Sequence, residues 1–291
     1  FEARFVVNAA GVDAGKVHAM AAPENFVTRP CRGEYYLLDK SAGSTVGRVI
    51  FQCPTAAGKG VLVAPTVHGN LIVGPNAQDV ADSADTATTA IGLARVEQSA
   101  RKSVPGVDLF ACIRNFAGIR ANTDRPDFVI QWAAPGFLDL AGMKSPGLSA
   151  AAAVGEEAAA LLQRAGLVLK EKENPVTTRK RIRFKELPGE EKAALIAREP
   201  SYGRVICRCE RVTEGEIIAA CHTAIPPRSI DGVKRRVGAG MGRCQGGFCG
   251  PRVMEILSRE LGKSPLEIPQ EGAASILLTG RTKQAKGDKT V

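Results

Sequence analysis

Short apolar runs alternate with glycine-rich or polar turns over roughly the first 165 residues, a pattern typical of a mixed α/β domain. Phe5-Val6-Val7 predicts a short buried strand. Further strands are predicted at residues 33–38, 47–51, 60–64, 71–74, 109–116, 127–132 and 136–140. Alanine-rich segments predict a helix at 85–103 and another from Ala150 onward. His68-Gly69-Asn70 lies between two predicted strands and predicts a hairpin turn.

Charged residues become dense after this region, and the helical signals that follow are short. Thr213-Glu214-Gly215-Glu216 has the spacing of a capping box and predicts a helix that reaches Cys221. Pro251 suits the first turn of another helix, where its missing donor costs little. We therefore expect an α/β region at 1–167, a charged linker at 168–200, a small helical domain at 201–265 and a polar tail at 266–291.

Four of the eight cysteines form two close pairs, C-x-C at Cys207 and Cys209 and C-x4-C at Cys244 and Cys249. Each short loop can present two thiolates to one inorganic core, which suits a [2Fe-2S] cluster. A structural zinc site is the alternative, but zinc loops usually space their ligands as C-x2-4-C, so the C-x-C pair fits zinc poorly. Arginines that would offset the charge of an anionic cluster stand beside the ligands: Arg208, Arg211, Arg243 and Arg252.

The remaining cysteines lack disulfide-like spacing, which favours a reducing compartment. We expect Cys31, Cys53 and Cys112 to be scattered, buried thiols, and Cys221 to be a core residue of its helix.

The formal net charge of +9 raises the question of nucleic acid. The basic residues gather at 170–185, at 234–236 and in the tail, without interleaved aromatic residues, so nucleic-acid binding is not expected. Compensation of the cluster, a solvated linker and an anionic substrate account for the charge. No apolar run is long enough for a signal peptide or a membrane span, so no integral membrane segment is expected.

The segment from Val205 to Leu261 resembles the bacterioferritin-associated-ferredoxin-like (BFD-like) [2Fe-2S] domain, a small helical module often appended to flavin dehydrogenases. The resemblance rests on the four paired cysteines, on Val205-Ile206-Cys207-Arg208-Cys209-Glu210 and on the capping box that follows. It implies that Cys207, Cys209, Cys244 and Cys249 hold a [2Fe-2S] cluster that transfers electrons.

A glycine-rich turn at residues 142–148 leads directly into the second alanine-rich helix. The N–H groups and dipole at such a helix start would stabilise the negative charge that a reduced flavin builds around N1 and its C2 carbonyl. An ordinary packing joint between strand and helix is the alternative. The small residues after the first strand would also let the backbone approach a ligand closely. The expected cofactor-binding residues are Asn8, Ala9, Ala10, Gly11, Gly142, Ser145, Pro146, Gly147 and Leu148.

Residues 1 to about 165 resemble the C-terminal portion of the D-amino-acid-oxidase superfamily. They are more narrowly similar to anaerobic glycerol-3-phosphate dehydrogenases and their relatives that oxidise 2-hydroxy acids. The segments that carry the resemblance are Asn8 to Gly11, Arg32 to Asp39, Pro65 to Pro75, Phe116 to Ala121 and Ser145 to Leu148. The resemblance implies FAD as cofactor. The glycine fingerprint that binds the dinucleotide in that family is absent, so we interpret the chain as a fragment, and FAD as a cofactor of the complete enzyme.

The resemblance places Arg120 at the phosphate or carboxylate of the substrate, where a guanidinium suits bidentate recognition. A structural arginine is the alternative, and Arg114 is a weaker candidate. Tyr35 and Tyr36 alternate across a predicted strand, so one would face the ligand and the other the core.

The catalytic base, where it is a histidine of this chain, must be one of three: His18, His68 or His222. The predicted hairpin favours His68, and a polar turn residue is the alternative.

The expected fold is therefore an α/β (α+β) substrate cap and partial FAD-binding domain, followed by a small helical [2Fe-2S] domain. The expected function is an FAD-dependent dehydrogenase that oxidises glycerol 3-phosphate or a related 2-hydroxy acid and passes electrons through the cluster. The alternatives are 2-hydroxyglutarate or an amino or imino acid as substrate, and a zinc or iron-sulfur binding module without catalysis. The expected partners are a small anionic substrate and an electron-acceptor subunit or quinone-linked protein. We expect a cytoplasmic protein, or one held at the inner face of the membrane by its partners.

Overall fold

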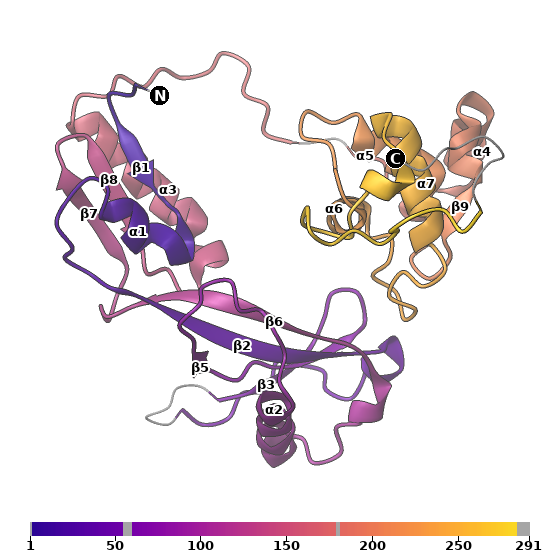
Figure 1. Cartoon of the computed structure of the whole chain (residues 1–291), viewed down its shortest axis with the longest axis horizontal. Coiled ribbons are helices and arrows are strands. Elements are labelled where there is room, and N and C mark those ends of the chain that lie inside the picture. Colours follow the sequence, from indigo (N-terminus) through magenta and orange to yellow (C-terminus); the bar gives the residue numbers. More distant parts are fainter. Residues whose placement is uncertain (1, 55–59, 179–180, 284–291) are drawn as a thin grey trace. The chain divides into compact units, whose positions relative to one another are not determined.

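The computed structural model describes residues 2–54, 60–178 and 181–283. The chain divides into two compact units, Phe1–Pro175 and Val176–Val291 (Figure 1). The first unit holds all the longer strands, and the second is mainly helical. Among the described residues, no helix is both long and apolar enough to cross a membrane.

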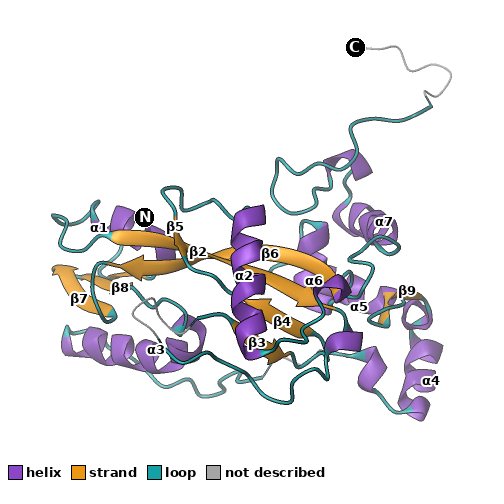
Figure 2. Ribbon diagram, turned by 90° about the horizontal axis from the view of Figure 1, so that it is seen from below, coloured by secondary structure: helices purple, strands orange, loops and turns teal. Residues whose placement is uncertain are grey.

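The larger sheet of the first unit is built on two long antiparallel strands, β2 (Thr28–Leu38) and β6 (Cys112–Thr123). The opposite edge of β2 pairs with β4 and β5, and β3 continues the sheet beyond β4. These shorter strands are β3 (Leu62–Pro65), β4 (Leu71–Gly74) and β5 (Gln78–Asp79). Helix α2 (Ala90–Ser103) lies across this sheet (Figure 2), and a core that includes Leu38, Val73 and Val96 fills the space beneath it.

Buried Glu34 on β2 fixes the start of α2. Its carboxylate accepts hydrogen bonds from the backbone N and the Oγ1 of Thr89, the N-cap residue of the helix. Gly92 passes so close to this carboxylate that no side chain would fit there. Because side chains alternate along a strand, Glu34 and Leu38 face α2, whereas Cys31, Gly33 and Tyr35 face the other side of the sheet.

The smaller sheet of the first unit has the order β1, β8, β7. Its strands are β1 (Val6–Asn8), β7 (Val129–Ala134) and β8 (Phe137–Ala141). β1 runs parallel to β8, and β7 runs antiparallel to it. Two helices accompany this sheet, α1 (Ala14–His18) and α3 (Gly147–Arg164). A small core beside it contains Ala14, Phe26, Val129 and Ala141.

The second unit packs three helices and a short antiparallel pair of strands around one apolar core. The helices are α5 (Glu214–Cys221), α6 (Ile230–Val237) and α7 (Gly250–Leu261), and the strands are β9 (Val205–Cys207) and β10 (Val212–Thr213). A fourth helix, α4 (Gly189–Arg198), packs against the neighbouring 3-10 helix at Pro200–Gly203. The capping box is confirmed, because the Thr213 and Glu216 side chains each accept the backbone N–H of the other. Pro251 lies in the first turn of α7, also as predicted.

Short 3-10 helices complete the described structure, at Gly11–Asp13, Lys40–Ala42, Leu109–Ala111, Phe184–Glu186, Pro200–Gly203 and Pro265–Glu267. The hairpin turn predicted at His68 is confirmed between β3 and β4, closed by hydrogen bonds between Thr66 and Asn70. In the predicted polar tail, residues 284–291 lie outside the described residues.

Some predicted elements were wrong. In place of the strand predicted at 47–51, the structure has a single antiparallel bridge between Ile50 and Val63. The helix at 85–103 begins only at Ala90, since the Thr89 side chain caps it there. The predicted linker contains α4, whose first residue follows Pro188, so this proline precedes a helix where we had expected a break. Cys53 is exposed and Cys112 half-buried, and only Cys31 is a buried thiol as expected.

Candidate functional site

Two of the predicted cofactor-binding turns leave the same edge of the smaller sheet. β1 and β8 are parallel, so the Asn8–Gly11 and Gly142–Leu148 turns both follow the carboxyl end of a strand. Ligands of open α/β sheets bind outside the carboxyl ends of parallel strands. Left-handed backbone at Gly11 (φ 61°) and Gly142 (φ 70°) makes both turns tight.

The second turn delivers the chain into α3 without a side-chain cap at Pro146 and without an acidic residue in the first helical turn. The start of this 18-residue helix therefore keeps its positive dipole end. Ala9, Ala10, Ser145, Pro146 and Leu148 are exposed at this edge, whereas Asn8 and Gly142 are buried beneath it. This arrangement fits a group that carries negative charge, as a flavin does when reduced.

A network of hydrogen bonds between buried polar side chains supports the Asn8 turn. The Asn8 amide donates to the Asp139 carboxylate at 2.7 Å and to the Ala14 carbonyl at 2.9 Å, and its Oδ1 accepts the N–H of Ala10. The other oxygen of Asp139 lies 2.6 Å from Nδ1 of His18. Nε2 of His18 lies 2.9 Å from the carbonyl of Pro23. The orientation of the turn is thus set by Asn8, Asp139 and His18 together.

His18 is fully buried, and both its ring nitrogens face acceptors. A carbonyl oxygen can only accept, so Nε2 carries a proton, and Nδ1 shares one with Asp139. Burial alone would lower the pKa of His18, but the hydrogen bonds to Pro23 and Asp139 outweigh it and raise the pKa above the usual value. A histidine held in this way is a structural cation of the core and not the base considered for the reaction.

Arg120 lies on the open face of the larger sheet, opposite Cys31 in the register of β2 and β6. Its guanidinium occupies the space above Gly33, where a Cβ atom would overlap it. Nη2 donates to the Asn76 carbonyl at 2.8 Å and Nη1 to the Cys31 sulfur at 3.3 Å. Two of the five guanidinium donors are used in this way, and the others have no partner among the described residues.

The neighbouring positions on this face leave open space beside Arg120. Gly118 pairs with Gly33, and a Cβ at Gly118 would meet no atom within 4 Å. On the far side, Tyr35 stacks on Phe116 with ring centroids 5.0 Å apart. Tyr35 is thus the tyrosine that faces the open side, while Tyr36 packs against the core under α2. An arginine, two glycines and an aromatic wall would suit a small anionic molecule.

The structure does not bring the other predicted histidines to Arg120. The turn of His68 immediately precedes Leu71, which pairs with Leu38, seven residues along β2 from the partner of Arg120. At about 3.4 Å per residue this is roughly 24 Å, so one small substrate would not reach both side chains. His222 belongs to the second unit and is paired there with Glu260 at 2.9 Å. The predicted catalytic role of His68 remains a prediction for the complete protein.

In the second unit the four paired cysteines meet as two sulfur pairs, each combining one residue from either loop. The sulfurs of Cys209 and Cys244 are 3.7 Å apart, and the buried thiol of Cys249 lies close enough to Cys207 to lower its pKa. Gly242 contacts Cys209 so closely that a side chain would displace it. Left-handed backbone at Gln245 (φ 47°) and Gly246 (φ 89°) turns the C-x4-C loop inward. Cys221 is separate, buried in the core, and burial raises its pKa to about 11.

Backbone N–H groups point at the sulfurs and favour their anionic form. The neighbouring Cys249 thiol lowers the pKa of Cys207 to about 6, and the amides of Gly240 and Glu210 act in the same direction against burial. The amides of Phe248 and Gly246 lower the pKa of Cys244. Each pair thus has one sulfur with a lowered pKa, which favours the thiolate form that metal ligation requires.

The arrangement in pairs distinguishes between the two predicted metal groups. Four thiolates around one zinc ion at about 2.3 Å would each stand about 3.8 Å from all the others. Among residues 2–54, 60–178 and 181–283, no three His, Cys, Asp or Glu side chains converge closely enough to hold a single ion. Two pairs suit a cluster of two irons with two cysteines each.

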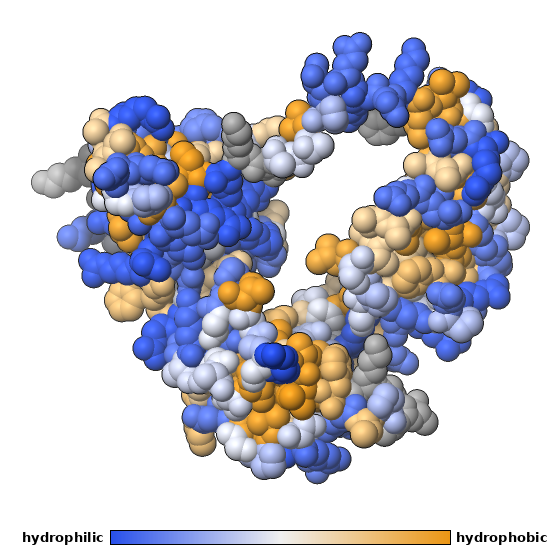
Figure 3. Space-filling view, turned by 180° about the vertical axis from the view of Figure 1, so that it is seen from behind, coloured by the Kyte–Doolittle hydropathy of each residue, from blue (hydrophilic) through white to orange (hydrophobic). Residues whose placement is uncertain are grey.

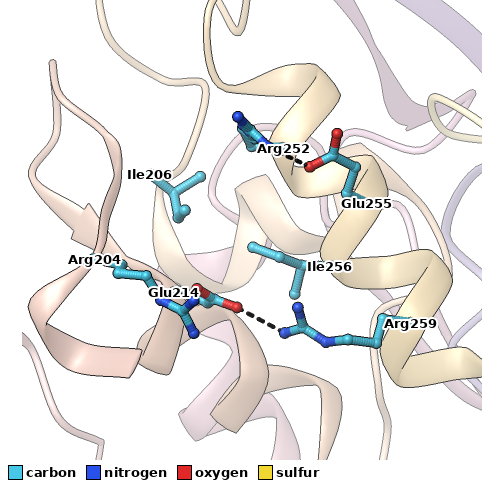
Figure 4. A pocket seen from close by; sticks show the side chains of 7 residues that line it. All are labelled: Arg204, Ile206, Glu214, Arg252, Glu255, Ile256 and Arg259. Carbon is cyan, nitrogen blue, oxygen red and sulfur yellow. Dashed lines mark hydrogen bonds and ion pairs between the residues drawn. The ribbon is translucent and has the colours of Figure 1, made fainter. Parts of the chain in front are cut away.

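A pocket of about 370 Å³ also lies in the second unit, between β9, α5 and α7 (Figure 4). Nearly buried Glu214 lies between two arginines, with contacts of 2.6 Å to Arg204 and 2.8 Å to Arg259. Arg252 is paired with Glu255. Because its cations already have carboxylate partners, this pocket ties α5 to α7 and is not a second anion site.

The two sites define a redox protein with a cofactor edge on one unit and a cluster site on the other. The family model described as FAD dependent oxidoreductase matches residues 1–161, and the BFD-like [2Fe-2S] binding domain matches residues 205–259. The chain therefore belongs to the FAD-dependent oxidoreductase family and carries a BFD-like domain. FAD and a [2Fe-2S] cluster are the cofactors of these two parts.

Individual relatives agree with this assignment. A glycerol 3-phosphate dehydrogenase of Caloramator mitchellensis is 48% identical over 286 residues, which cover 97% of this chain and 60% of that protein. A glycerol 3-phosphate oxidase of Mycoplasma genitalium is 34% identical over 178 residues, 60% of this chain and 46% of that protein. The FAD-bound L-alpha-glycerophosphate oxidase of Mycoplasma pneumoniae has a similar structure, with a TM-score of 0.52 and 32% identity over 58% of this chain and 44% of that one. The chain thus spans about half to 60% of the length of these relatives.

Proposed function

We propose that this chain is part of a dehydrogenase that oxidises glycerol 3-phosphate with FAD and passes the electrons on through its [2Fe-2S] cluster. The observation that carries the proposal is the extent of the likeness to the Caloramator protein, named a dehydrogenase, which includes both units. The two proteins named oxidases match only 178 and 166 residues, close to the length of the first unit. A cluster after the flavin is what a dehydrogenase with a protein acceptor needs and an oxidase does not.

When bound, FAD supplies a two-electron acceptor and the cluster a one-electron relay. The residues of the chain position the reactants. Arg120 would bind the phosphate through its remaining guanidinium donors, and the open space over Gly118 would leave room for the carbon chain of the substrate. The Asn8 turn and the start of α3 would hold the flavin, with the dipole of α3 favouring its reduced form.

The location and partners follow from the same features. None of the eight cysteines lies in a disulfide, which suits a reducing, cytoplasmic location. The acceptor would be a separate subunit or a quinone-linked protein, which could also hold the enzyme at the inner face of the membrane.

A substrate panel on the complete protein tests the proposal. Under anaerobic conditions, glycerol 3-phosphate should bleach the flavin absorbance near 450 nm faster than D-lactate, 2-hydroxyglutarate or proline does, because only it offers a phosphate to Arg120. Faster bleaching by 2-hydroxyglutarate or by an amino acid would move the substrate assignment to those classes. No bleaching by any of them would contradict a dehydrogenase of this kind.

Cys244→Ser separates the two redox steps. The variant should still bleach its flavin with glycerol 3-phosphate but should lose most reduction of a protein or quinone acceptor. An unchanged rate of acceptor reduction would contradict the relay role of the cluster. Cys53→Ser, which removes an exposed thiol of the first unit, is the matched control and should change neither step.

A further inference from the structure

The cluster site has an inner and an outer pair of sulfurs. Cys207 and Cys249 belong to the apolar core of the second unit and are 2% and 3% exposed. Cys209 is exposed and Cys244 is partly exposed. One side of a bound cluster would therefore face the core, and the other would face the surface. Electrons that leave for a separate protein have their shortest route through the outer pair.

The surface around the outer pair combines positive charge with apolar side chains. We call it the outer edge and define it by the exposed residues next to Cys209 and Cys244, namely Arg208, Arg211, Met241, Arg243 and Phe248. The loops that carry them touch, because Gly242 packs directly against Cys209. Phe248 is 88% exposed and Met241 38% exposed. Among the described residues, no hydrogen bond or ion pair holds Arg208 or Arg211.

One acidic side chain, that of Glu210, lies beside the outer edge but contributes little to its surface. It is only 11% exposed, with one carboxylate oxygen 3.8 Å from Nζ of Lys185 and the other beside Gly242. Aromatic residues, methionine and arginine at a surface with little exposed carboxylate are the composition of a protein–protein interface.

The charge of the whole unit points the same way. The second unit holds 22 of the 39 Lys and Arg residues and 13 of the 30 Asp and Glu residues, so it carries the entire formal charge of +9. The first unit, with 17 residues of each kind, is neutral. The face of the second unit visible in Figure 3 is accordingly mostly hydrophilic.

We propose that the outer edge is the docking surface for an acidic redox protein, which takes one electron at a time from the cluster with Phe248 in the centre of the contact and the arginines around it. The inference rests on the proposed function and names the partner class that it left open. In each encounter the singly reduced cluster returns to its oxidised state and the acceptor gains one electron. Two encounters remove the two electrons of one substrate molecule.

Other occupants fit the observations less well. The first unit of the same chain is neutral and offers no complementary charge. An anionic membrane would match the arginines, but the apolar part of the outer edge is two side chains rather than an amphipathic helix face. Nucleic acid would require stacking aromatic residues beside a basic groove, and Phe248 is the lone aromatic side chain of the outer edge.

Small acceptors of opposite charge test the electrostatic part on this chain with its cluster assembled in vitro. After reduction with dithionite, stopped-flow absorbance would follow reoxidation by ferricyanide, an anion, and by hexaammineruthenium(III), a cation. Arg208→Glu should lower the ratio of the ferricyanide rate to the ruthenium rate roughly tenfold at low ionic strength and much less at about 0.5 M salt. A redox titration of each variant would correct for a changed potential of the cluster.

Arg228→Glu is the matched control, because it makes the same charge change on an exposed side chain of the same unit. Arg228 precedes the start of α6, whereas the cluster loop follows its end, about 12 Å away along an eight-residue helix. Equal effects of the two variants, or none from Arg208→Glu, would overturn the proposal. A chain that assembles no cluster would instead contradict the proposed function.

Binding of a small acidic redox protein gives a second readout that does not depend on turnover. With flavodoxin as the probe, calorimetry should show salt-sensitive binding to the cluster-loaded chain. Phe248→Ala and Arg208→Glu should each weaken it roughly tenfold or more, with cluster content unchanged, while Arg228→Glu retains it. Binding to phosphatidylserine vesicles with no binding to flavodoxin, or an equal loss in the control, would overturn the proposal.

Discussion

The two units solve the problem of holding a cofactor in different ways. In the first unit, backbone turns at a sheet edge and one long-range polar chain shape the site, and net charge plays no part. In the second unit, four side chains from two loops provide every ligand within 43 residues, in a strongly basic setting. The difference explains why the cluster site can be recognised from spacing alone, whereas the flavin edge exists only after residues 131 positions apart have come together at Asn8 and Asp139.

The largest expected effect is the loss of the cluster from the second unit while the first unit stays intact. Cys209→Ser should abolish the cluster, because the outer pair then has a single thiolate. Iron and sulfide content and the visible absorption of the purified chain would measure this. Cys221→Ala is the control, since this cysteine lies in the core, outside the two loops that carry the cysteine pairs. A full cluster in the Cys209 variant would mean that the ligand set is wrong.

The buried hydrogen-bond network of Asn8, Asp139 and His18 under the flavin edge should give the next largest effect. His18→Asn should lower the free energy of unfolding by roughly 3–5 kcal/mol, because it leaves the Asp139 carboxylate buried without its cation. Urea titration monitored by circular dichroism would measure the loss in the first unit. Lys16→Asn, which removes an exposed ion pair on the same helix, should cost less than about 1 kcal/mol.

The stabilisation by His18 should also depend on pH. The groups facing its ring are the carboxylates of Asp139 and Glu24, the Pro23 carbonyl and the Phe26 ring. Because the pKa of His18 is raised in the folded protein, its contribution is complete below the unfolded value of about 6.5 and declines as pH rises through the folded value. The difference between wild type and His18→Asn should therefore shrink between neutral and alkaline pH. A difference that grows with pH would contradict a protonated His18.

Substitution of Arg120 would test the open face of the larger sheet. In the complete protein, Arg120→Ala should reduce kcat/KM for glycerol 3-phosphate roughly 30- to 1,000-fold, as the loss of about 2–4 kcal/mol of charge-assisted binding implies. Arg114→Ala, on an exposed position of the same strand, should change it less than about threefold. Steady-state kinetics would decide, and equal effects of the two variants would argue for general electrostatics over a specific contact.

The smallest effects would come from the helix caps and would show whether the units unfold separately. Thr89→Ala removes the cap of α2 and Thr213→Ala that of α5, each at a cost of about 1 kcal/mol. In calorimetry, each substitution should shift only the transition of its own unit. If either variant shifted both transitions equally, the two units would have to be a single cooperative structure.

Local signals in the sequence were sufficient for the features that depend on neighbouring residues. The capping box at Thr213 and the place of Pro251 in the first turn of α7 were confirmed because each depends on residues close along the chain, and the cluster ligands were predicted from the spacing of the cysteines alone. The role of His18 could not be predicted, since its partner Asp139 is 121 residues away and a histidine carries no sign of its burial. The open space beside Arg120 likewise depends on the register that places Gly33 opposite Gly118.

The close approach of the two outer sulfurs has a consequence for the protein without its iron. Cys209 and Cys244 are 3.7 Å apart and accessible, and a disulfide bond is about 2.05 Å long, so a small movement would join them. In air, dioxygen would take the two electrons and two protons released as this bond forms. The oxidised apoprotein should then bind no iron until a thiol reductant cleaves the disulfide. Exposure to oxygen before cluster assembly would therefore determine what fraction of the protein can bind a cluster.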